Sequence, residues 1–553
     1  MMCGFVGVAG ATVPPDKLSA ALATIAHRGP DGHQVLLRGG HSIAACRLAI
    51  TPPLDAPPLA SSPCSWLALN GELYDLARTD SETDTLAAFT RLTHESGEIN
   101  VSLSHLRGLF AMAYSDEHGV TTLARDHFGI KPLYWANWNG GVAFASEMKA
   151  LLALGVNEEP DRDVLASFSA IGFNVFRGRT PFRHISSIIP GSTLTVENDA
   201  SWRMQYFQRQ KIEASTLCSE EEIDFEVERR LIQSLRRTML HDSHPKALFL
   251  SGGLDSTLLL HLAASFGKIE AFTLWDGVNV DDCAEAKIVA EGLGVAWHPL
   301  VVTPDMLDQA ITHYSWHFER PIGGGGFDLL GGVAFHVLTA EIAKTHRVAL
   351  CGEGADELFY GYHKFHVDPE SLASEMTQRI ASTRNEALRE WAFQSGLEHP
   401  ASARVSLARL ARREGLSEYH LPSVDASGMA YGLEIRPPFL DVELVNFVES
   451  LPTESLVNYT KGLTKMPLRR IMSRLALKGH RSPVRRKRAM AFSITAPWHQ
   501  LLRRMVLKDE NALIPLMASL HTYLRRISPS EPPTIPFSEI VSNREVRAQC
   551  MSF

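Results

Sequence analysis

Two short stretches of the sequence have the residue types needed to bind phosphate groups. In "LFLSGGLDST" (248–257), an apolar run leads into a Ser-Gly-Gly turn, and Asp255 follows at the start of a helical pattern. Glycines let backbone N–H groups approach an anion closely, and the first turn of a helix attracts negative charge. Such a turn is also an ordinary strand-to-helix connection, and Asp255 could either cap the helix or hold Mg²⁺.

The second stretch, "LCGEGADELFYGYHKF" (350–365), also follows an apolar run. It has three carboxylates within five residues, Glu353, Asp356 and Glu357. Close carboxylates repel one another unless a cation lies between them. Alone, the stretch could be a solvated acidic loop. Beside the Ser-Gly-Gly turn on a neighbouring strand, it predicts a site for Mg²⁺ and pyrophosphate.

A third candidate is Cys3, in the opening "MMCGFVGVAG". A cysteine in apolar surroundings is commonly a buried hydrophobe. A cysteine at the amino terminus can instead be a nucleophile that uses the free α-amine as its base. That amine is free only if Cys3 becomes the first residue. Methionine is removed before a small residue, so we expect translation to start at Met2.

The elements that must position these residues fall into two groups. Residues 3–150 contain short β-like runs separated by turn signals, with helical patterns at 15–26 and 84–94, which indicates a layered α/β or α+β domain. From about residue 210, strands predicted at 246–250, 269–274, 295–302 and 347–351 alternate with helices. This alternation predicts a doubly wound parallel sheet, and the pattern is mostly helical after about residue 370.

Length and composition limit the possible classes of protein. A chain of 553 residues favours two domains of roughly 200 and 350 residues. The net charge of −8 does not favour nucleic acid as a general partner, and we expect no membrane span and no signal peptide. The seven cysteines are scattered without a CxxC pair, which is typical of a reduced, cytoplasmic protein without structural zinc.

Seven motifs, in this order, resemble those of glutamine-dependent asparagine synthetases. They are "HRGPDG" (27–32), "NGELYD" (70–75), "ARDHFGIKPLYW" (124–135), "FASEMKAL" (144–151), "SGGLDST" (251–257), "GEGADELFYGY" (352–362) and "MAYGLEIRPPFLD" (429–441). The SGGLDS turn is similar to the pyrophosphate loop of N-type ATP pyrophosphatases. The resemblance implies an Ntn-type αββα amidotransferase domain over 3–205. It also implies a doubly wound ATP pyrophosphatase domain with a helical carboxyl-terminal part over 210–553.

The resemblance assigns glutamine hydrolysis to the first domain. The Cys3 thiolate would attack the glutamine carboxamide while the α-amine relays the proton. Retention of Met1 would leave the enzyme dependent on free ammonia. The resemblance further implies that Arg47 binds the glutamine carboxylate. It implies that Asn70 and Gly71 form the oxyanion hole, and that Glu72 and Asp84 bind the glutamine ammonium group.

The same resemblance assigns ATP, Mg²⁺ and an acyl-adenylate to the second domain. Asp255 and Asp356 would hold Mg²⁺ and pyrophosphate, and Glu353 would act in adenylate formation and its attack by ammonia. Lys487, or alternatively Arg488, would stabilise the pentacoordinate phosphorus. The residues implied to frame ATP are Leu250, Ser251, Gly252, Gly253, Asp255, Ser256, Leu274, Cys351 and Gly352.

Some positions depart from the family pattern. Cys351 replaces a serine, Asp75 an asparagine, and Ala426 a frequent arginine or lysine, while 321–332 is unusually glycine-rich. A pocket with one cation fewer and more glycines could accept a carboxylate other than aspartate. We therefore predict an amide ligase with aspartate as the default substrate, a different carboxylate being the alternative.

Two rival functions, and the role of a basic segment, remain open. A lasso-peptide or macrolactam cyclase would use a peptide amine, but Cys3 and the glutamine-binding residues argue against it. A non-catalytic homologue would be expected to lose carboxylates that this chain retains. The basic segment 469–488 could be a solvated face, an RNA-like patch or a wall over the ATP phosphates, of which the last fits the family. The expected partners are glutamine, ATP and aspartate or another carboxylate. We expect neither nucleic acid nor a membrane as a partner, and the sequence is compatible with a homodimer.

Overall fold

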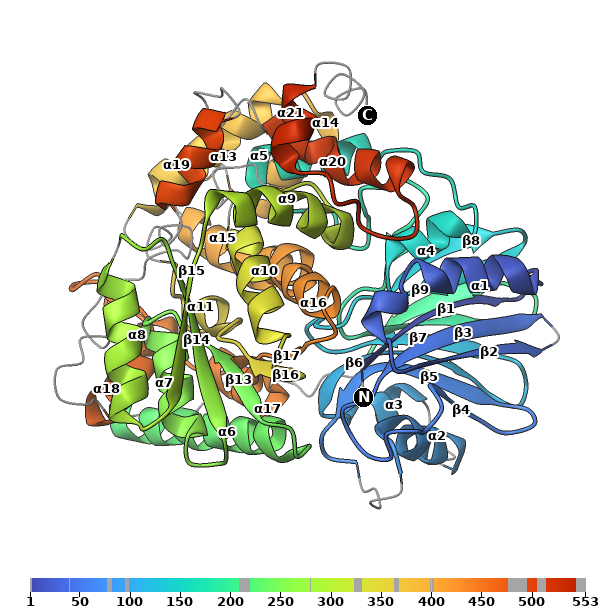
Figure 1. Ribbon diagram of the computed structural model, residues 1–553, viewed down its shortest axis with the longest axis horizontal. Helices are drawn as coiled ribbons and strands as arrows, with labels where there is room; N and C mark the ends of the chain where they lie inside the picture. The colour runs from blue at the N-terminus through green and yellow to red at the C-terminus, as the bar shows by residue number, and fades with distance from the viewer. Residues whose placement is uncertain are drawn as a thin grey trace.

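The computed structural model places the amino-terminal and carboxyl-terminal halves of the chain side by side (Figure 1). It describes residues 2–38, 40–76, 82–94, 99–207, 219–278, 280–322, 331–362, 368–397, 399, 402–475, 495–504 and 514–543. Within these ranges, no helix combines the length and apolar character that crossing a membrane requires.

The amino-terminal half contains two antiparallel sheets of six strands each. The first has the order β10-β8-β9-β1-β3-β2 and the second the order β12-β11-β7-β6-β5-β4. The strands of the first sheet are β1 (Met2–Ala9), β2 (Gly32–Arg38), β3 (His41–Leu48), β8 (Tyr134–Trp138), β9 (Gly141–Ala145) and β10 (Ser186–Ser187). Those of the second are β4 (Leu59–Ser61), β5 (Trp66–Leu73), β6 (Gly108–Ser115), β7 (Thr121–Arg125), β11 (Ser192–Val196) and β12 (Trp202–Tyr206).

Alternating side chains place these sheets between two layers of helices. Along β1, Phe5 packs with Trp66 of the other sheet, whereas Val6 packs with Leu18 of α1 (Pro15–Ala23). Successive side chains of a strand point to opposite faces, so each sheet has one face toward the other sheet and one toward helices. Helices α1 and α4 (Met148–Ala153) cover the first sheet, and α2 (Asp84–His94) and α3 (Ile99–Ser104) cover the second. The αββα prediction is confirmed.

The carboxyl-terminal half is built on a five-stranded parallel sheet with the order β15-β14-β13-β16-β17. Its strands are β13 (Lys246–Phe249), β14 (Ile269–Trp275), β15 (Ala296–Val301), β16 (Val348–Leu350) and β17 (Glu434–Arg436). On β13, Leu248 packs with helices on one face and Phe249 with helices on the other. The doubly wound sheet is therefore confirmed, although β17 had no sequence signal because a three-residue strand shows no period.

Helices of the second half cover both faces of this sheet (Figure 1). One face contacts α6 (Glu220–Leu240), α7 (Leu254–Ala263), α8 (Val280–Gly292), α17 (Val442–Glu449) and α18 (Met466–Leu475). Around the other face lie α9 (Pro304–Phe318), α10 (Gly331–Ile342), α13 (Pro369–Ser382), α14 (Glu386–Ser395), α15 (Ala403–Leu410), α16 (Leu421–Met429), α19 (Thr495–Arg504), α20 (Ile514–Ile527) and α21 (Phe537–Ser542). Helix α5 (Arg162–Ile171) of the first half packs into this second layer.

The direction of the strand order reverses between β13 and β16. From β13 the chain moves outward to β14 and β15, and it then returns to place β16 on the other side of β13. Ligands of open parallel sheets bind at such a reversal, outside the carboxyl ends of the strands. The two phosphate-type motifs begin directly after β13 and β16, so the topology brings them to the same edge of the sheet.

Candidate functional site

The first part of the site lies where β1 pairs with β3. The backbone of Cys3 is opposite Arg47 in this antiparallel pair, while the Cys3 side chain lies outside the described residues. Arg47 is buried and donates hydrogen bonds to the carbonyl oxygens of Leu54 and Ala56, at 2.6 and 2.7 Å, and of Pro53, at 2.6 Å. The guanidinium implied to hold the glutamine carboxylate therefore also fixes the loop next to β3.

The expected oxyanion-hole pair lies on β5. Gly71 has a φ of 133°, and a Cβ at this position would lie 1.9 Å from the carbonyl oxygen of Leu109. Only glycine fits this backbone, because L-residues avoid such a φ and the neighbouring strand leaves no space. Asn70, immediately before it, is fully buried.

The two carboxylates implied to hold the glutamine ammonium group contact the second half of the chain. Glu72 accepts a hydrogen bond from the Arg436 guanidinium on β17 at 2.6 Å, and Asp84 lies 3.0 Å from His241 Nε2 after α6. Burial would raise the pKa of Glu72, but the attraction of Arg436, together with that of other nearby positive charges including His241, lowers it to about 2. The sequence did not predict that Arg436 and His241 contact these carboxylates, since no motif links either residue to the glutamine site.

The second part of the site lies at the reversal point of the parallel sheet. Asp255, in the first turn of α7, and Asp356, in α11 (Ala355–Leu358), both contact the ammonium group of Lys465, at 2.5 and 2.7 Å. Two carboxylates that share one cationic atom are close enough to share a divalent cation, and oxygen donors are those that Mg²⁺ prefers. The residues present therefore fit Mg²⁺.

Lys465 is the residue that sequence reasoning missed here. It precedes α18, which packs against α7, and its side chain is almost fully buried. In the sequence, Lys465 is marked only by its position just before an amphipathic helix, and the surrounding region contains many other Lys and Arg residues. The predicted residue Lys487, with its alternative Arg488, lies outside the described residues.

The remaining residues expected to frame ATP surround these carboxylates. Ser251 Oγ lies 3.1 Å from Ser256 Oγ across the turn, and a Cβ at Gly352 would lie 3.5 Å from the Cβ of Asp255. Leu250 is buried directly after β13, and Leu274 is buried on β14. Gly252 and Gly253 form the turn that follows Leu250. Cys351 is also buried, and burial raises the pKa of its thiol, so it remains a neutral thiol near neutral pH.

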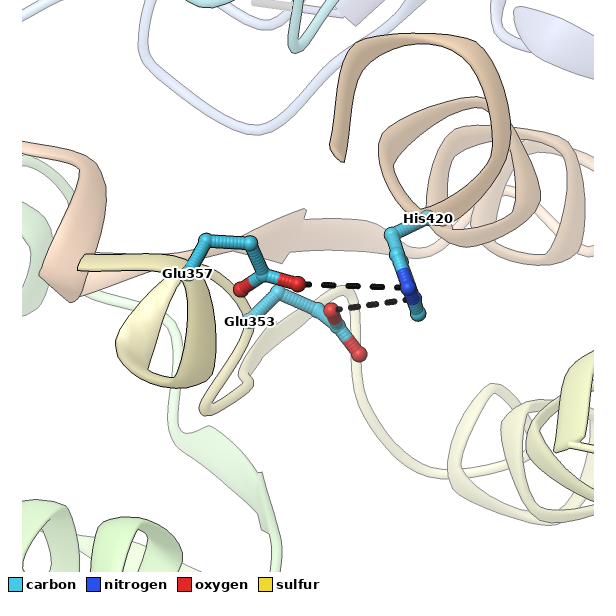
Figure 2. A group of neighbouring side chains, drawn as sticks. All are labelled: Glu353, Glu357 and His420. Carbon is cyan, nitrogen blue, oxygen red and sulfur yellow. Dashed lines mark ion pairs between the residues drawn. The ribbon is translucent and has the colours of Figure 1, made fainter. Parts of the chain in front are cut away.

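Glu353 belongs to a group of side chains at the same edge of the sheet. Its carboxylate lies 3.7 Å from Nδ1 of His420, and Nε2 of this histidine lies 3.9 Å from Glu357. Figure 2 shows the imidazole at the end of its helix, facing both carboxylates. The Tyr362 hydroxyl donates to Glu357 at 2.5 Å and lies 3.2 Å from His420 Nε2. His420 was another functional candidate that no sequence motif indicated.

Charged groups near the expected acyl pocket are engaged with other parts of the protein. Ala426 is buried, and the preceding Asp425 binds Arg28 and Lys131 of the first half at 2.9 and 3.1 Å. Arg436 is bonded to Glu72, and Arg320 donates to the Tyr134 hydroxyl at 2.8 Å. The glycine-rich segment 323–326 lies outside the described residues.

Comparisons with known proteins agree with this two-part arrangement. A family model described as asparagine synthase matches residues 226–513, and one described as a glutamine amidotransferase domain matches residues 2–207. Asparagine synthetase [glutamine-hydrolyzing] 1 of Bacillus subtilis is 30% identical over 406 residues, which cover 69% of this chain and 62% of the relative.

Two further relatives match over a similar length. A putative asparagine synthetase of Mycobacterium tuberculosis (strain ATCC 25618 / H37Rv) is 30% identical over 414 residues, covering 67% of this chain and 62% of its own. Amidase chry2 of Gibberella zeae is 29% identical over 392 residues, covering 64% and 56%. The chain thus spans less than two thirds of the length of these relatives. Because the asparagine synthase model matches more than half of its residues behind an amidotransferase domain, the chain belongs to the glutamine-dependent asparagine synthetase family.

Proposed function

We propose that this protein is an ATP- and glutamine-dependent amide ligase. Glutamine is hydrolysed at Cys3, and the ammonia moves to the second half of the chain. There a carboxylate is activated as its acyl-adenylate, and ammonia displaces AMP. Aspartate is the default carboxylate, and asparagine, AMP and pyrophosphate are then the products.

One observation carries the proposal for the second site. Asp255 and Asp356 come from two motifs 101 positions apart, and both contact Lys465 where β13 and β16 end. A buried ammonium group between two carboxylates forms a compact charged centre at the place where parallel sheets bind nucleotides. When bound, Mg²⁺ supplies neutralisation of the phosphate charge.

The residues of this chain have separate tasks in the proposed reaction. Ser251 and the turn that follows it present hydroxyl and N–H groups to the phosphates, and Lys465 supplies positive charge as the phosphorus centre is attacked. Glu353 lies beside the acyl group. In the first half, the Asn70 amide and the Gly71 N–H donate to the oxyanion formed from glutamine.

Product analysis tests the function. The purified chain is incubated with ATP, Mg²⁺, glutamine and aspartate, and nucleotides, pyrophosphate and amide are quantified. We expect AMP, pyrophosphate and asparagine in equal amounts, with glutamate formed from glutamine. ADP and phosphate as products would rule out adenylation.

A second candidate is the same chemistry on a carboxylate other than aspartate. Ala426 offers no cation, while Arg320 and Arg436, which could have replaced one, are bonded to Tyr134 and Glu72. A charged amino-acid substrate needs paired partners when buried. Loss of one such contact costs on the order of 2–3 kcal/mol, or about 30–150-fold in kcat/KM. The fungal relatives named amidases are compatible with this candidate.

A panel of carboxylic acids distinguishes the two candidates. Pyrophosphate release is measured for each acid with ATP and glutamine saturating. The second candidate predicts a higher kcat/KM for a larger carboxylate than for aspartate. A KM for aspartate below about 1 mM, with full turnover, would reject the second candidate and leave asparagine synthesis.

A further inference from the structure

The Glu353, Glu357 and His420 group contains a histidine that the proposed reaction has not yet used. Figure 2 shows the imidazole facing both carboxylates from one side, with Glu353 on the loop after β16 and Glu357 on α11. His420 is the last residue of η3 (Ala411–His420), a ten-residue π-helical segment that continues into α16. Helices of this type are rare and short, and they occur frequently at functional sites.

The hydrogen bonds around His420 determine which of its nitrogens can accept a proton. The single hydrogen of the Tyr362 hydroxyl is donated to Glu357 at 2.5 Å. Burial and the nearby Glu357 carboxylate raise the pKa of Tyr362 far above its ordinary value, so this hydroxyl retains its hydrogen. The 3.2 Å contact between Tyr362 and His420 then requires Nε2–H of the imidazole to donate to the tyrosine oxygen. The lone pair of the neutral ring is therefore on Nδ1.

That lone pair faces the carboxylate implied to act in amide formation. Nδ1 lies 3.7 Å from an oxygen of Glu353, and both side chains are a little over one quarter exposed. Among the residues that the structure describes, Glu353, Glu357 and Tyr362 face the imidazole, together with the ring of Tyr419 at 5.5 Å between centroids. The partial exposure of His420 and Glu353 leaves a path for the proton to water.

We infer that His420 is a positioning residue that relays the proton lost by ammonia, and this inference rests on the proposed function. Ammonia forms a C–N bond to the acyl carbon of the adenylate, and the carbonyl π electrons move to oxygen. The nitrogen then loses one proton to Glu353, which passes it to His420 Nδ1. Collapse of the oxyanion breaks the C–O bond to AMP and leaves the amide. His420 releases the proton to solvent, so acyl-adenylate and ammonia give amide, AMP and one proton.

Two half-reactions separate this role from adenylation. ATP–pyrophosphate exchange that depends on the carboxylate reports adenylate formation, which needs no ammonia. Amide formation from ammonium chloride reports the second half-reaction and bypasses Cys3. We compare the wild-type chain with His420→Gln and Tyr362→Phe. The matched control is His298→Gln, in which the lost imidazole lies 2.9 Å from Glu270, outside both sites.

We expect His420→Gln to keep its exchange rate and to lose about 10–100-fold in amide formation, at or below the lower end of the range for general-base catalysis because His420 acts through Glu353. Its pH–rate profile for amide formation should also differ from that of the wild type, because one proton-carrying group of the relay is missing. Tyr362→Phe should lose less and keep the shape of the wild-type profile, and His298→Gln should resemble the wild type.

The other outcomes are also decisive. Equal amide formation in His420→Gln and wild type, or an unchanged pH profile, overturns the relay. A parallel fall of exchange and amide formation assigns His420 to the structure of the whole site and overturns it as well. If the folded wild-type chain shows no exchange with any carboxylate, the proposed function itself fails.

Discussion

The ion pair between Glu72 and Arg436 joins a proposed glutamine contact to the parallel sheet, and its strength can be measured. Both side chains are fully buried, and the pair is 2.6 Å long. The pKa of Glu72 falls from an ordinary 4.5 to about 2, because the guanidinium and other nearby positive charges, among them His241, together more than offset burial. Each tenfold change in protonation is about 1.4 kcal/mol, so these charges together stabilise the ionised carboxylate by on the order of 3 kcal/mol.

The perturbation is Arg436→Met, which leaves the Glu72 carboxylate buried without its guanidinium. Removing one partner of a buried pair costs about 3–5 kcal/mol. Asp242, the other partner of Arg436, keeps Lys246 at 2.8 Å. Adding Glu72→Gln to Arg436→Met removes the buried charge, so the double variant should regain about 2–3 kcal/mol.

Urea unfolding at neutral pH gives the free energies of unfolding of the wild type, Arg436→Met, Glu72→Gln and the double variant, which form a double-mutant cycle. The control is Arg183→Met, which removes an exposed pair of 2.7 Å with Glu159 and should cost less than about 1 kcal/mol. A double variant no more stable than Arg436→Met would refute the reasoning, because the buried carboxylate would then not be the source of the loss.

The pair also has a predictable pH dependence. The pKa of Glu72 is lower in the folded state, so its stabilisation is complete above about pH 4.5 and is lost as the pH falls toward 2. The stability gap between wild type and Arg436→Met should therefore narrow over this range. A gap that stays constant down to pH 3 would contradict the assignment of the low pKa to this pair.

Three further predictions concern the rest of the chain. Cys3→Ala should abolish glutamine-dependent amide formation and leave ammonia-dependent formation within about two-fold, as quantified by amide analysis, and intact mass should show a wild-type chain beginning at Cys3. Lys465→Ala and Asp356→Asn should each lower pyrophosphate release by at least about 100-fold while glutaminase activity persists; equal loss of both activities would contradict separate sites. Burial lowers the pKa of His313 to about 4, so its contribution to stability is present above pH 6.5 and declines toward pH 4; His313→Gln should show a smaller fall in Tm over this range than the wild type, and an identical fall would contradict this.

Much of the fold could be predicted because local sequence patterns indicate its helices and strands. The short β-like runs of β1 and β5 indicate buried strands, and the helix at 220–240 has its capping box and dipole-matched charges within its own sequence. Strands β10 and β17, of two and three residues, could not be predicted, since so few residues show no periodicity.

The chemistry of the motifs was likewise local. The backbone of a Ser-Gly-Gly turn after a strand, and the charges of the carboxylates after a Gly-Glu-Gly turn, are properties of the local sequence. They do not depend on the position of the rest of the chain. Gly354, in the second motif, has a φ of 89° and starts α11 against Leu440, which only glycine tolerates without strain. The sequence by itself therefore determined where the glycine-containing turns and the carboxylates that follow them would be.

Only the tertiary structure decided which distant residues complete the site. Lys465 adopts a φ of 58°, a conformation that costs an L-residue about 1 kcal/mol and that the surrounding packing imposes. Its contact with Asp255 and Asp356 depends on α18 packing against α7, and the pairing of Arg436 with Glu72 depends on how the two halves meet. Such contacts join residues far apart in the chain, and several nearby Lys and Arg residues have the same local character. Their selection follows from packing geometry, which no local pattern encodes.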